Sequence, residues 1–241
     1  EFSRSCDPEL ARVAEHCRYR LYDLETRLLA DQSRRQRLAA ARLCLITSPV
    51  PQLLEVVEQA LKAGVRLVQH RSKLSDDLPR YQEALALRDL CAAHGALFIV
   101  NDRVDLALAV ESDGVHLGQG DLPPAQARRL LGPDRLIGRS THAPVQLQQA
   151  MADGCDYAGV GPLQATPTKP GREPVGLDYL RQATEMATIP HYAIGGVDAQ
   201  LLPALLEAGG SRCRVAVVRA VMEAADPAAA TRELLELLGD G

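Results

Sequence analysis

Short apolar runs alternate with longer amphipathic segments from residue 43 onward. The short runs are rich in Val, Ile and Leu and predict buried β-strands, whereas the segments between them repeat apolar residues at helical spacing. The predicted strands are 43–47, 67–69, 97–100, 114–117, 136–138, 157–160, 191–194 and 215–218. The predicted helices include 51–63, 78–94, 123–131, 144–153, 177–187 and 199–208.

Strict alternation of strand and helix predicts an α/β protein with parallel strands joined by crossover helices. Eight such units close naturally into a (β/α)8 TIM barrel, which we assign to residues 42–241. A doubly wound sheet is the alternative. That fold usually carries a Gly-rich loop after its first strand, but residues 47–50 read Thr-Ser-Pro-Val.

Residues 1–41 have a different character, being rich in Arg, Glu, Gln and Leu and free of Gly. Asp7 and Pro8 read as an N-cap followed by Pro at the first helical position. The stretch predicts one or two amphipathic helices, an N-terminal extension that serves packing or assembly into a homo-oligomer. Its apolar positions at helical spacing are Leu10, Val13, Ala14, Cys17, Leu21, Leu24 and Leu28.

Composition narrows the class of function. The hydrophobic fraction of 46% supports a sizeable core, and the net charge of −4 gives no bulk attraction to nucleic acid or to anionic membranes. No apolar run approaches the ~20 residues that span a bilayer. We therefore expect a cytoplasmic protein that acts on small molecules. The cysteines are widely spaced and predict reduced, buried thiols: Cys6, Cys17, Cys44, Cys91, Cys155 and Cys213.

Polar residues follow the predicted strands, where the active site of a TIM barrel lies. Gln69, Arg71 and Lys73 alternate after the second strand, and this spacing places their side chains on one side of an extended segment. Two cations and an amide suit a diphosphate, although an exposed basic loop has the same pattern. Asn101 follows the next strand, and Ser140 follows the fifth.

Two carboxylates follow the third and fourth predicted strands. Asp102 and Asp121 each resemble a helix cap when taken alone. Together, beside cationic and amide groups, they favour Mg²⁺, which prefers oxygen ligands. The histidines do not form an acid–base arrangement, and we expect His116 to be a packed, hydrogen-bonded residue of the core.

The segment 162–176 is long and rich in Pro, Gly and Thr, which is typical of a functional lid. It contains Thr166, Thr168 and Lys169. Gly195 and Gly196 end the seventh predicted strand, where backbone N–H groups of such barrels commonly bind phosphate, although a plain tight turn is the alternative.

Several segments together resemble the thiamine-phosphate synthase family. They occur in the family's order over residues 43–223: VQHRSK (68–73), VNDRVDLALA (100–109), DGVHLGQ (113–119) with Asp121, IGRSTH (137–142), DYAGVGP (156–162), TPTK (166–169) and AIGG (193–196). The resemblance implies an alkyl-transferring enzyme. It couples 4-amino-2-methyl-5-(diphosphooxymethyl)pyrimidine to 4-methyl-5-(2-phosphoethyl)thiazole, forms thiamine phosphate and releases diphosphate.

The resemblance also implies a role for each matching residue. Arg71, Lys73, Ser140 and Lys169 would act on the departing diphosphate, and Gln69 and Asn101 would join them in binding the pyrimidine substrate. Thr166, Thr168 and Gly196 would contact the thiazole phosphate. Asp102 and Asp121 would be the magnesium ligands.

One position departs from the family pattern. Arg219 stands where such sequences usually have a Ser, after Val217 and Val218. Because of this departure, the family pattern does not specify every residue that binds the thiazole phosphate. Arg219 is itself a candidate phosphate ligand. A thiazole tautomerase-like relative and a non-catalytic binding barrel are the alternative functions. The tautomerase would be expected to lose part of the diphosphate and metal set, and a non-catalytic pocket would have no need of converging cations and carboxylates.

Overall fold

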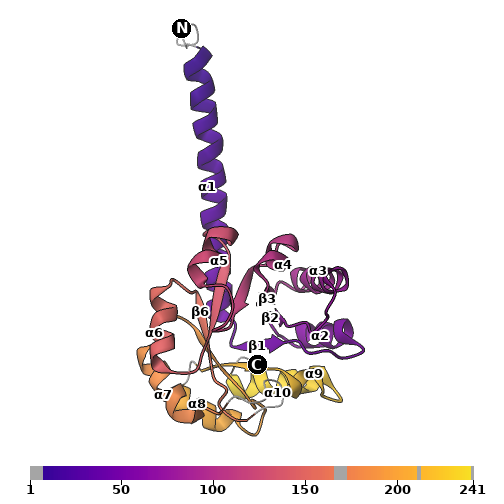
Figure 1. The fold of residues 1–241 in the computed structure, drawn as a ribbon. Helices are drawn as coiled ribbons and strands as arrows, with labels where there is room; N and C mark the ends of the chain where they lie inside the picture. Colours follow the sequence, from indigo (N-terminus) through magenta and orange to yellow (C-terminus); the bar gives the residue numbers. More distant parts are fainter. Residues whose placement is uncertain (1–7, 166–172, 211–212, 240–241) are drawn as a thin grey trace.

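A closed barrel of parallel strands forms the body of the molecule (Figure 1). The structure is a computed structural model that describes residues 8–165, 173–210 and 213–239. The predicted (β/α)8 barrel is confirmed, since every strand pairs in parallel with its sequence neighbour and β8 pairs with β1. The strands are β1 (Leu43–Ile46), β2 (Leu67–His70), β3 (Leu97–Asn101), β4 (Gly114–Leu117), β5 (Leu136–Thr141), β6 (Tyr157–Val160), β7 (His191–Ile194) and β8 (Arg214–Val217).

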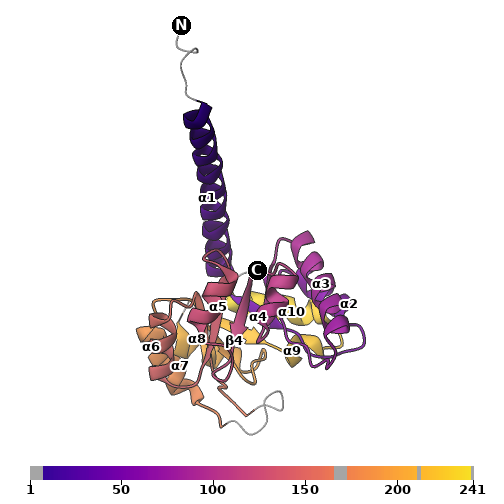
Figure 2. The same ribbon diagram turned by 45° about the horizontal axis from the view of Figure 1, so that its top comes forward.

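Helices surround the barrel on its outer side (Figure 2). Three helices, α4, α9 and α10, fall outside the helices named from the sequence. Helices α4 and α9 are six and four residues long, too short to establish a helical period. The helices after the first are α2 (Leu53–Lys62), α3 (Asp77–Ala93), α4 (Val104–Ala109), α5 (Pro124–Leu131), α6 (Pro144–Ala152), α7 (Gly176–Met186), α8 (Leu202–Gly209), α9 (Arg219–Met222) and α10 (Pro227–Leu238).

Alternation along the strands divides the apolar residues into two layers. Strand residues of one parity, such as Leu45, Val68 and Phe98, pack between the sheet and the helices. Residues of the other parity, such as Ile99 and Leu136, fill the barrel interior. Because side chains alternate along a strand, this parity also decides which polar residues can reach the cavity at the carboxyl end.

The N-terminal extension is a single helix, α1 (Pro8–Ala40), that stands away from the barrel over most of its length (Figures 1 and 2). The 33 residues contain no Gly, and Pro occurs only at the first position, so nothing in the sequence interrupts the helix. Large apolar side chains, including Leu10, Tyr19 and Leu21, are exposed along it. Among the described helices, none is long and apolar enough to cross a membrane.

The last turns of α1 pack against the barrel. Leu38 is 1% exposed and joins the interior layer at the amino ends of the strands. The Tyr192 hydroxyl donates to the carbonyls of Leu38 and Ala41 at 3.2 and 2.8 Å. Arg34 pairs with Asp113 at 3.0 Å. The predicted domain boundary at residue 41 stays a prediction, and these contacts favour placing it several residues earlier.

Candidate active site

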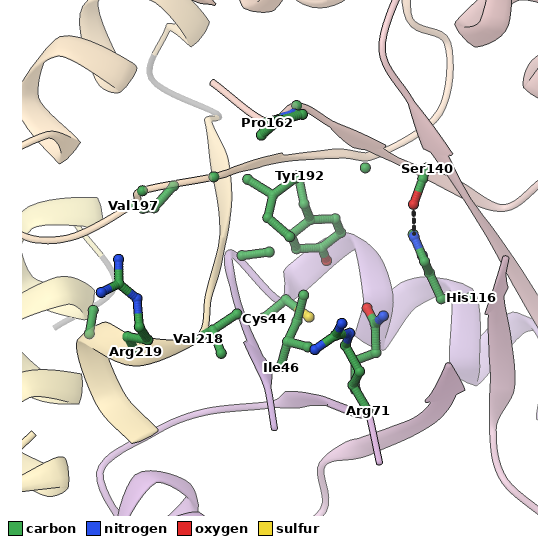
Figure 3. A pocket seen from close by; sticks show the side chains of 18 of the residues that line it. Cys44, Ile46, Arg71, His116, Ser140, Pro162, Tyr192, Val197, Val218 and Arg219 are labelled. Atoms are coloured by element: carbon green, nitrogen blue, oxygen red, sulfur yellow. Dashed lines mark hydrogen bonds between the residues drawn. The ribbon is translucent and has the colours of Figure 1, made fainter. Parts of the chain in front are cut away.

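A cavity of about 390 Å³ opens at the carboxyl ends of the strands (Figure 3). Its floor is apolar and consists of inward-facing residues such as Cys44, Tyr192 and Ala216. Among the residues predicted for the site, Gln69, Arg71, Asn101, Ser140 and Gly196 line it. The structure therefore brings together residues that are as much as 127 positions apart in the chain, counting from Gln69 to Gly196.

Gln69 and Asn101 form one wall of the cavity. Gln69 is buried on β2, and its Nε2 donates to Asn101 Oδ1 at 2.7 Å. Because this bond uses the Asn101 oxygen as acceptor, the Asn101 amide N–H groups are left to donate toward the cavity. The pair thus fixes the orientation of two amides before any substrate binds.

Lys73 does not share one surface with Gln69 and Arg71 as the alternation predicted, since of the three only Gln69 and Arg71 line the cavity. Strand β2 ends at His70, so the period of two stops there. The Arg71 N–H donates to Thr47 Oγ1 at 2.9 Å, which joins this turn to the end of β1. Lys73 is exposed and lines a neighbouring hollow between the loops after β1 and β2, and Arg71 borders both spaces.

Ser140 belongs to a hydrogen-bond network whose members line the cavity. Strand β5 continues to Thr141, so Ser140 lies within the strand rather than after it. His116 Nε2 shares a hydrogen bond with Ser140 Oγ at 2.9 Å (Figure 3). His116 Nδ1 shares another with the Tyr157 hydroxyl at 3.2 Å. Burial raises the pKa of Tyr157 well above its usual value, so its phenol is neutral.

A glycine makes room for this network. A Cβ at Gly138 would lie 2.1 Å from Tyr157 Cζ and 2.6 Å from His116 Nδ1. The expectation that His116 is packed and hydrogen-bonded is confirmed, since it is 7% exposed. Its place beside the cavity was not predicted, because it depends on the pairing of His116 with Gly138 between β4 and β5.

Both candidate metal ligands lie beside the end of β4. Asp102 has φ +66°, a backbone conformation that Asp tolerates better than most residues, and its N–H donates to the His116 carbonyl at 2.8 Å. Asp121 Oδ2 accepts from the Gly118 N–H at 2.6 Å. Since His116 and Gly118 are two residues apart, both aspartates are held at the same edge of the barrel, although neither is among the described residues that line the cavity.

The opposite side of the cavity is formed by the ends of β7 and β8. Gly195 and Gly196 have φ values of +107° and +74°, which L side chains rarely adopt. A Cβ at Gly195 would lie 2.6 Å from Pro162 Cα, so the turn packs directly on the segment after β6. Arg219 lines this side too. Thr166, Thr168 and Lys169, which were predicted to belong here, lie outside the described residues.

The fold and the cavity define the class of protein. A closed parallel barrel with polar residues gathered at the carboxyl ends of its strands is the architecture of TIM-barrel enzymes. Amide and guanidinium groups on one side and a glycine turn with a second guanidinium on the other equip this cavity for a ligand that is anionic at both ends.

Comparisons with known proteins identify the family. The profile of the family described as thiamine monophosphate synthase matches residues 43–221. Thiamine-phosphate synthase from Gloeobacter violaceus is 55% identical over 241 residues, which cover all of this chain and 70% of the relative. The enzyme of the same name from Thermosynechococcus vestitus is 51% identical over 243 residues, covering all of this chain and 69% of the relative.

A solved structure agrees with the sequence comparisons. Thiamine phosphate pyrophosphorylase from Pyrococcus furiosus superposes with a TM-score of 0.77 at 35% identity, covering 86% of this chain and 98% of that chain. The chain therefore belongs to the thiamine monophosphate synthase family. The family that the sequence motifs indicated is thereby confirmed.

Proposed function

We propose that this chain joins the pyrimidine diphosphate to the thiazole phosphate, yielding thiamine phosphate and diphosphate. Membership of the family supports the reaction. The observation that carries the proposal is the convergence of Gln69, Arg71, Asn101 and Ser140 on one cavity whose far side holds the Gly195–Gly196 turn. Two phosphorylated substrates placed head to head need such an arrangement.

The reaction requires neutralisation of the charge on the leaving diphosphate rather than a strong base. The bond between the pyrimidine methylene carbon and the diphosphate oxygen breaks, and the electron pair leaves with the diphosphate. The thiazole nitrogen supplies the pair for the new carbon–nitrogen bond and has no proton to lose. The Arg71 guanidinium stabilises the charge that grows on the leaving oxygens. Lys73 and Lys169 are proposed to add to this stabilisation.

Gln69, Asn101 and Ser140 orient the pyrimidine substrate. The bond from Gln69 to Asn101 holds both amides in place, so little rearrangement is needed at the moment of reaction. The Ser140 hydroxyl is held by His116, which is itself held by Tyr157. We assign His116 a positioning role behind Ser140.

Asp102 and Asp121 are suited to hold Mg²⁺ together with the substrate diphosphate. The fit rests on the way the backbone at the end of β4 holds both residues. The described residues contain no group of three His, Cys, Asp or Glu side chains placed to hold a metal. Mg²⁺ is commonly bound by one or two carboxylates, substrate phosphates and waters, so two aspartates are sufficient. Bound there, the ion would supply charge stabilisation to the leaving diphosphate.

Turnover of the purified protein tests the proposal. Incubation with both substrates and Mg²⁺ should release diphosphate in a one-to-one ratio with thiamine phosphate, and omission of either substrate should abolish the release. Interconversion of thiazole isomers without coupling would instead indicate a tautomerase-like relative. Tight binding of either substrate without any conversion would indicate a binding barrel.

A further inference from the structure

We infer that Arg219 makes this enzyme selective for a phosphorylated thiazole by binding the phosphate through its guanidinium group. The inference rests on the proposed function and adds a specificity-determining residue to it. Arg219 follows Val217 and Val218, where the family resemblance led us to expect a Ser. The structure adds where this side chain lies.

Arg219 borders the cavity at the side away from Arg71. It follows β8 directly and lines the cavity with Gly195, Gly196 and Val197 of the neighbouring β7 turn. In Figure 3 its side chain extends from the end of β8 toward the segment that carries Val197. Val218, Ile46 and Tyr192 lie between it and Arg71 in the same view.

The cavity thus has a cation on each of two sides and an apolar centre. Ile46 and Tyr192 offer flat or apolar surface to heterocyclic rings, and the two arginines offer charge to the groups at either end. Arg71 stands beside the amides of Gln69 and Asn101, the end assigned to the diphosphate. Arg219, the other Lys or Arg among the described residues that line the cavity, therefore faces the end that receives the phosphate of the thiazole.

Two carboxylates also line this part of the cavity. They belong to Asp198 and Glu223, and both would repel a phosphate dianion. Asp198 Oδ1 accepts from the Leu201 N–H at 2.8 Å, so this carboxylate is engaged by the start of α8. Within the described part of the chain, no ion pair forms between Arg219 and either carboxylate. The guanidinium is thus placed to offset the local negative charge and to bind phosphate with two N–H groups.

Substitution of Arg219 should separate phosphate recognition from catalysis. In Arg219→Ser, KM for the thiazole phosphate should rise roughly tenfold or more, the size expected for a charge-assisted contact. The value of kcat and KM for the pyrimidine diphosphate should stay within about threefold of the wild type, because the contact is similar in ground and transition states. Arg219→Lys keeps the charge but loses the two-pronged geometry, so its KM for the thiazole phosphate should lie between those of the wild type and Arg219→Ser. Arg129→Ser, which removes an exposed arginine from α5, should change none of these constants.

A binding measurement that needs no turnover accompanies the kinetics. Isothermal titration of the wild type should give tighter binding of thiamine phosphate than of thiamine, and Arg219→Ser should lose most of that preference. Glu223→Gln should change KM for the thiazole phosphate in the opposite direction, lowering it, because a repelling charge is removed. Thermal unfolding of each variant checks that the fold is intact.

The outcomes distinguish this inference from the proposed function. If the wild type turns over and Arg219→Ser keeps both its KM and its preference for the phosphorylated product, the role of Arg219 is wrong and the synthase activity stands. If the wild type fails to turn over but Arg219→Ser abolishes a measured preference, the phosphate site stands and the activity is wrong. A rise only in KM for the pyrimidine diphosphate would place Arg219 at the other end and overturn the inference.

Discussion

At the scale of single residues, the metal proposal depends on two aspartates that the backbone holds beside β4. Substitution of Asp102 needs the more care, because its φ of +66° is energetically costly for most residue types. Asn tolerates the left-handed region nearly as well as Asp, so Asp102→Asn removes the charge with little backbone penalty. It is therefore a better test than Asp102→Ala.

Removal of the Asp102 charge should weaken metal-dependent turnover. We expect EDTA to abolish diphosphate release, Mg²⁺ to restore it, and Asp102→Asn to lower kcat/KM by roughly 10²-fold, about the loss of one preorganised stabilising group. The Mg²⁺ concentration that gives half-maximal rate should rise in this variant. Asp178→Ala, which alters an exposed carboxylate on α7, is the control. Full activity in EDTA would exclude the metal assignment.

Two histidines, the buried His70 and the half-buried His191, predict a loss of stability in mild acid. Burial is the main cause that lowers the pKa of His70 and of His191 below 6.5, and it outweighs the hydrogen bond that His70 shares with Glu83 at 2.7 Å. The folded state therefore resists protonation that the unfolded chain accepts. Stability should be fully present above about pH 6.5 and be lost as the pH falls from there toward the lowered folded-state values.

Urea unfolding between about pH 7.5 and about pH 5 measures this loss. The double variant His70→Gln, His191→Gln should lose less free energy of unfolding over that interval than the wild type does. His16→Gln alters an exposed histidine on α1 and should leave the slope unchanged. An equal slope in the double variant and the wild type would assign the acid sensitivity to other groups.

At the scale of elements, α1 divides into an exposed rod and an end that closes the barrel. Deletion of residues 1–32 should leave kcat within about tenfold, a barrier change of ~1.4 kcal/mol, because none of the residues described in this segment lines the cavity. Deletion of residues 1–41 should destabilise the fold by at least ~2–5 kcal/mol, since it empties the position of the buried Leu38.

A point variant isolates the same contact without truncation. Tyr192→Phe removes the hydroxyl that donates to the carbonyls of Leu38 and Ala41 and should lower the free energy of unfolding by about 1–2 kcal/mol. Thermal unfolding of the 1–32 deletion, the 1–41 deletion and Tyr192→Phe, each compared with the wild type, measures these losses of stability. If the 1–32 deletion is folded but inactive, α1 contributes to catalysis in a way that the cavity does not reveal.

The elements also show how far the sequence alone can predict this molecule. Strand and helix order is local information, carried by periodicity in windows of several residues, and it is sufficient for the closed barrel. The end of β2 at His70 is not evident from the pattern, and it separates Lys73 from Gln69. The contact between Tyr192 and the end of α1 joins residues more than 150 positions apart, for which no local pattern exists.

The same limit applies to the candidate site. Gln69, Arg71, Asn101 and Ser140 could be found because polar residues at strand ends are unusual and match a family motif. His116 and Tyr157 could not be placed beside the cavity, since their meeting requires the register of three strands and the space at Gly138. Strand parity is the one signal that would have placed them, because inward positions at the carboxyl end belong to the cavity.

At the scale of the whole molecule, the two ends of the barrel have different roles: one end is packed with stabilising apolar residues and the other carries the candidate active site. The amino ends of the strands are closed by Leu38 and Ala41 within a continuous apolar cluster. The carboxyl ends carry the polar residues and the cavity. The expectation of free, buried thiols is confirmed for four cysteines that are distributed through the core between these ends: Cys44, Cys91, Cys155 and Cys213. It is wrong for Cys17, which is exposed on α1, and Cys6 lies outside the described residues.

The buried thiols provide a test of whether the barrel unfolds as one unit. Burial raises the pKa of Cys91 and of Cys155 to about 12 and that of Cys213 to about 11, so the reactive thiolate is scarce at neutral pH. In a background with Cys6→Ser and Cys17→Ser, a thiol reagent should label the native protein very slowly. If the barrel is cooperative, all four sites should become reactive over one range of denaturant that coincides with the loss of circular dichroism. Mass spectrometry of labelled peptides reports each site separately. Labelling of Cys213 before the other three would show that the last strand and helices open as a separate unit.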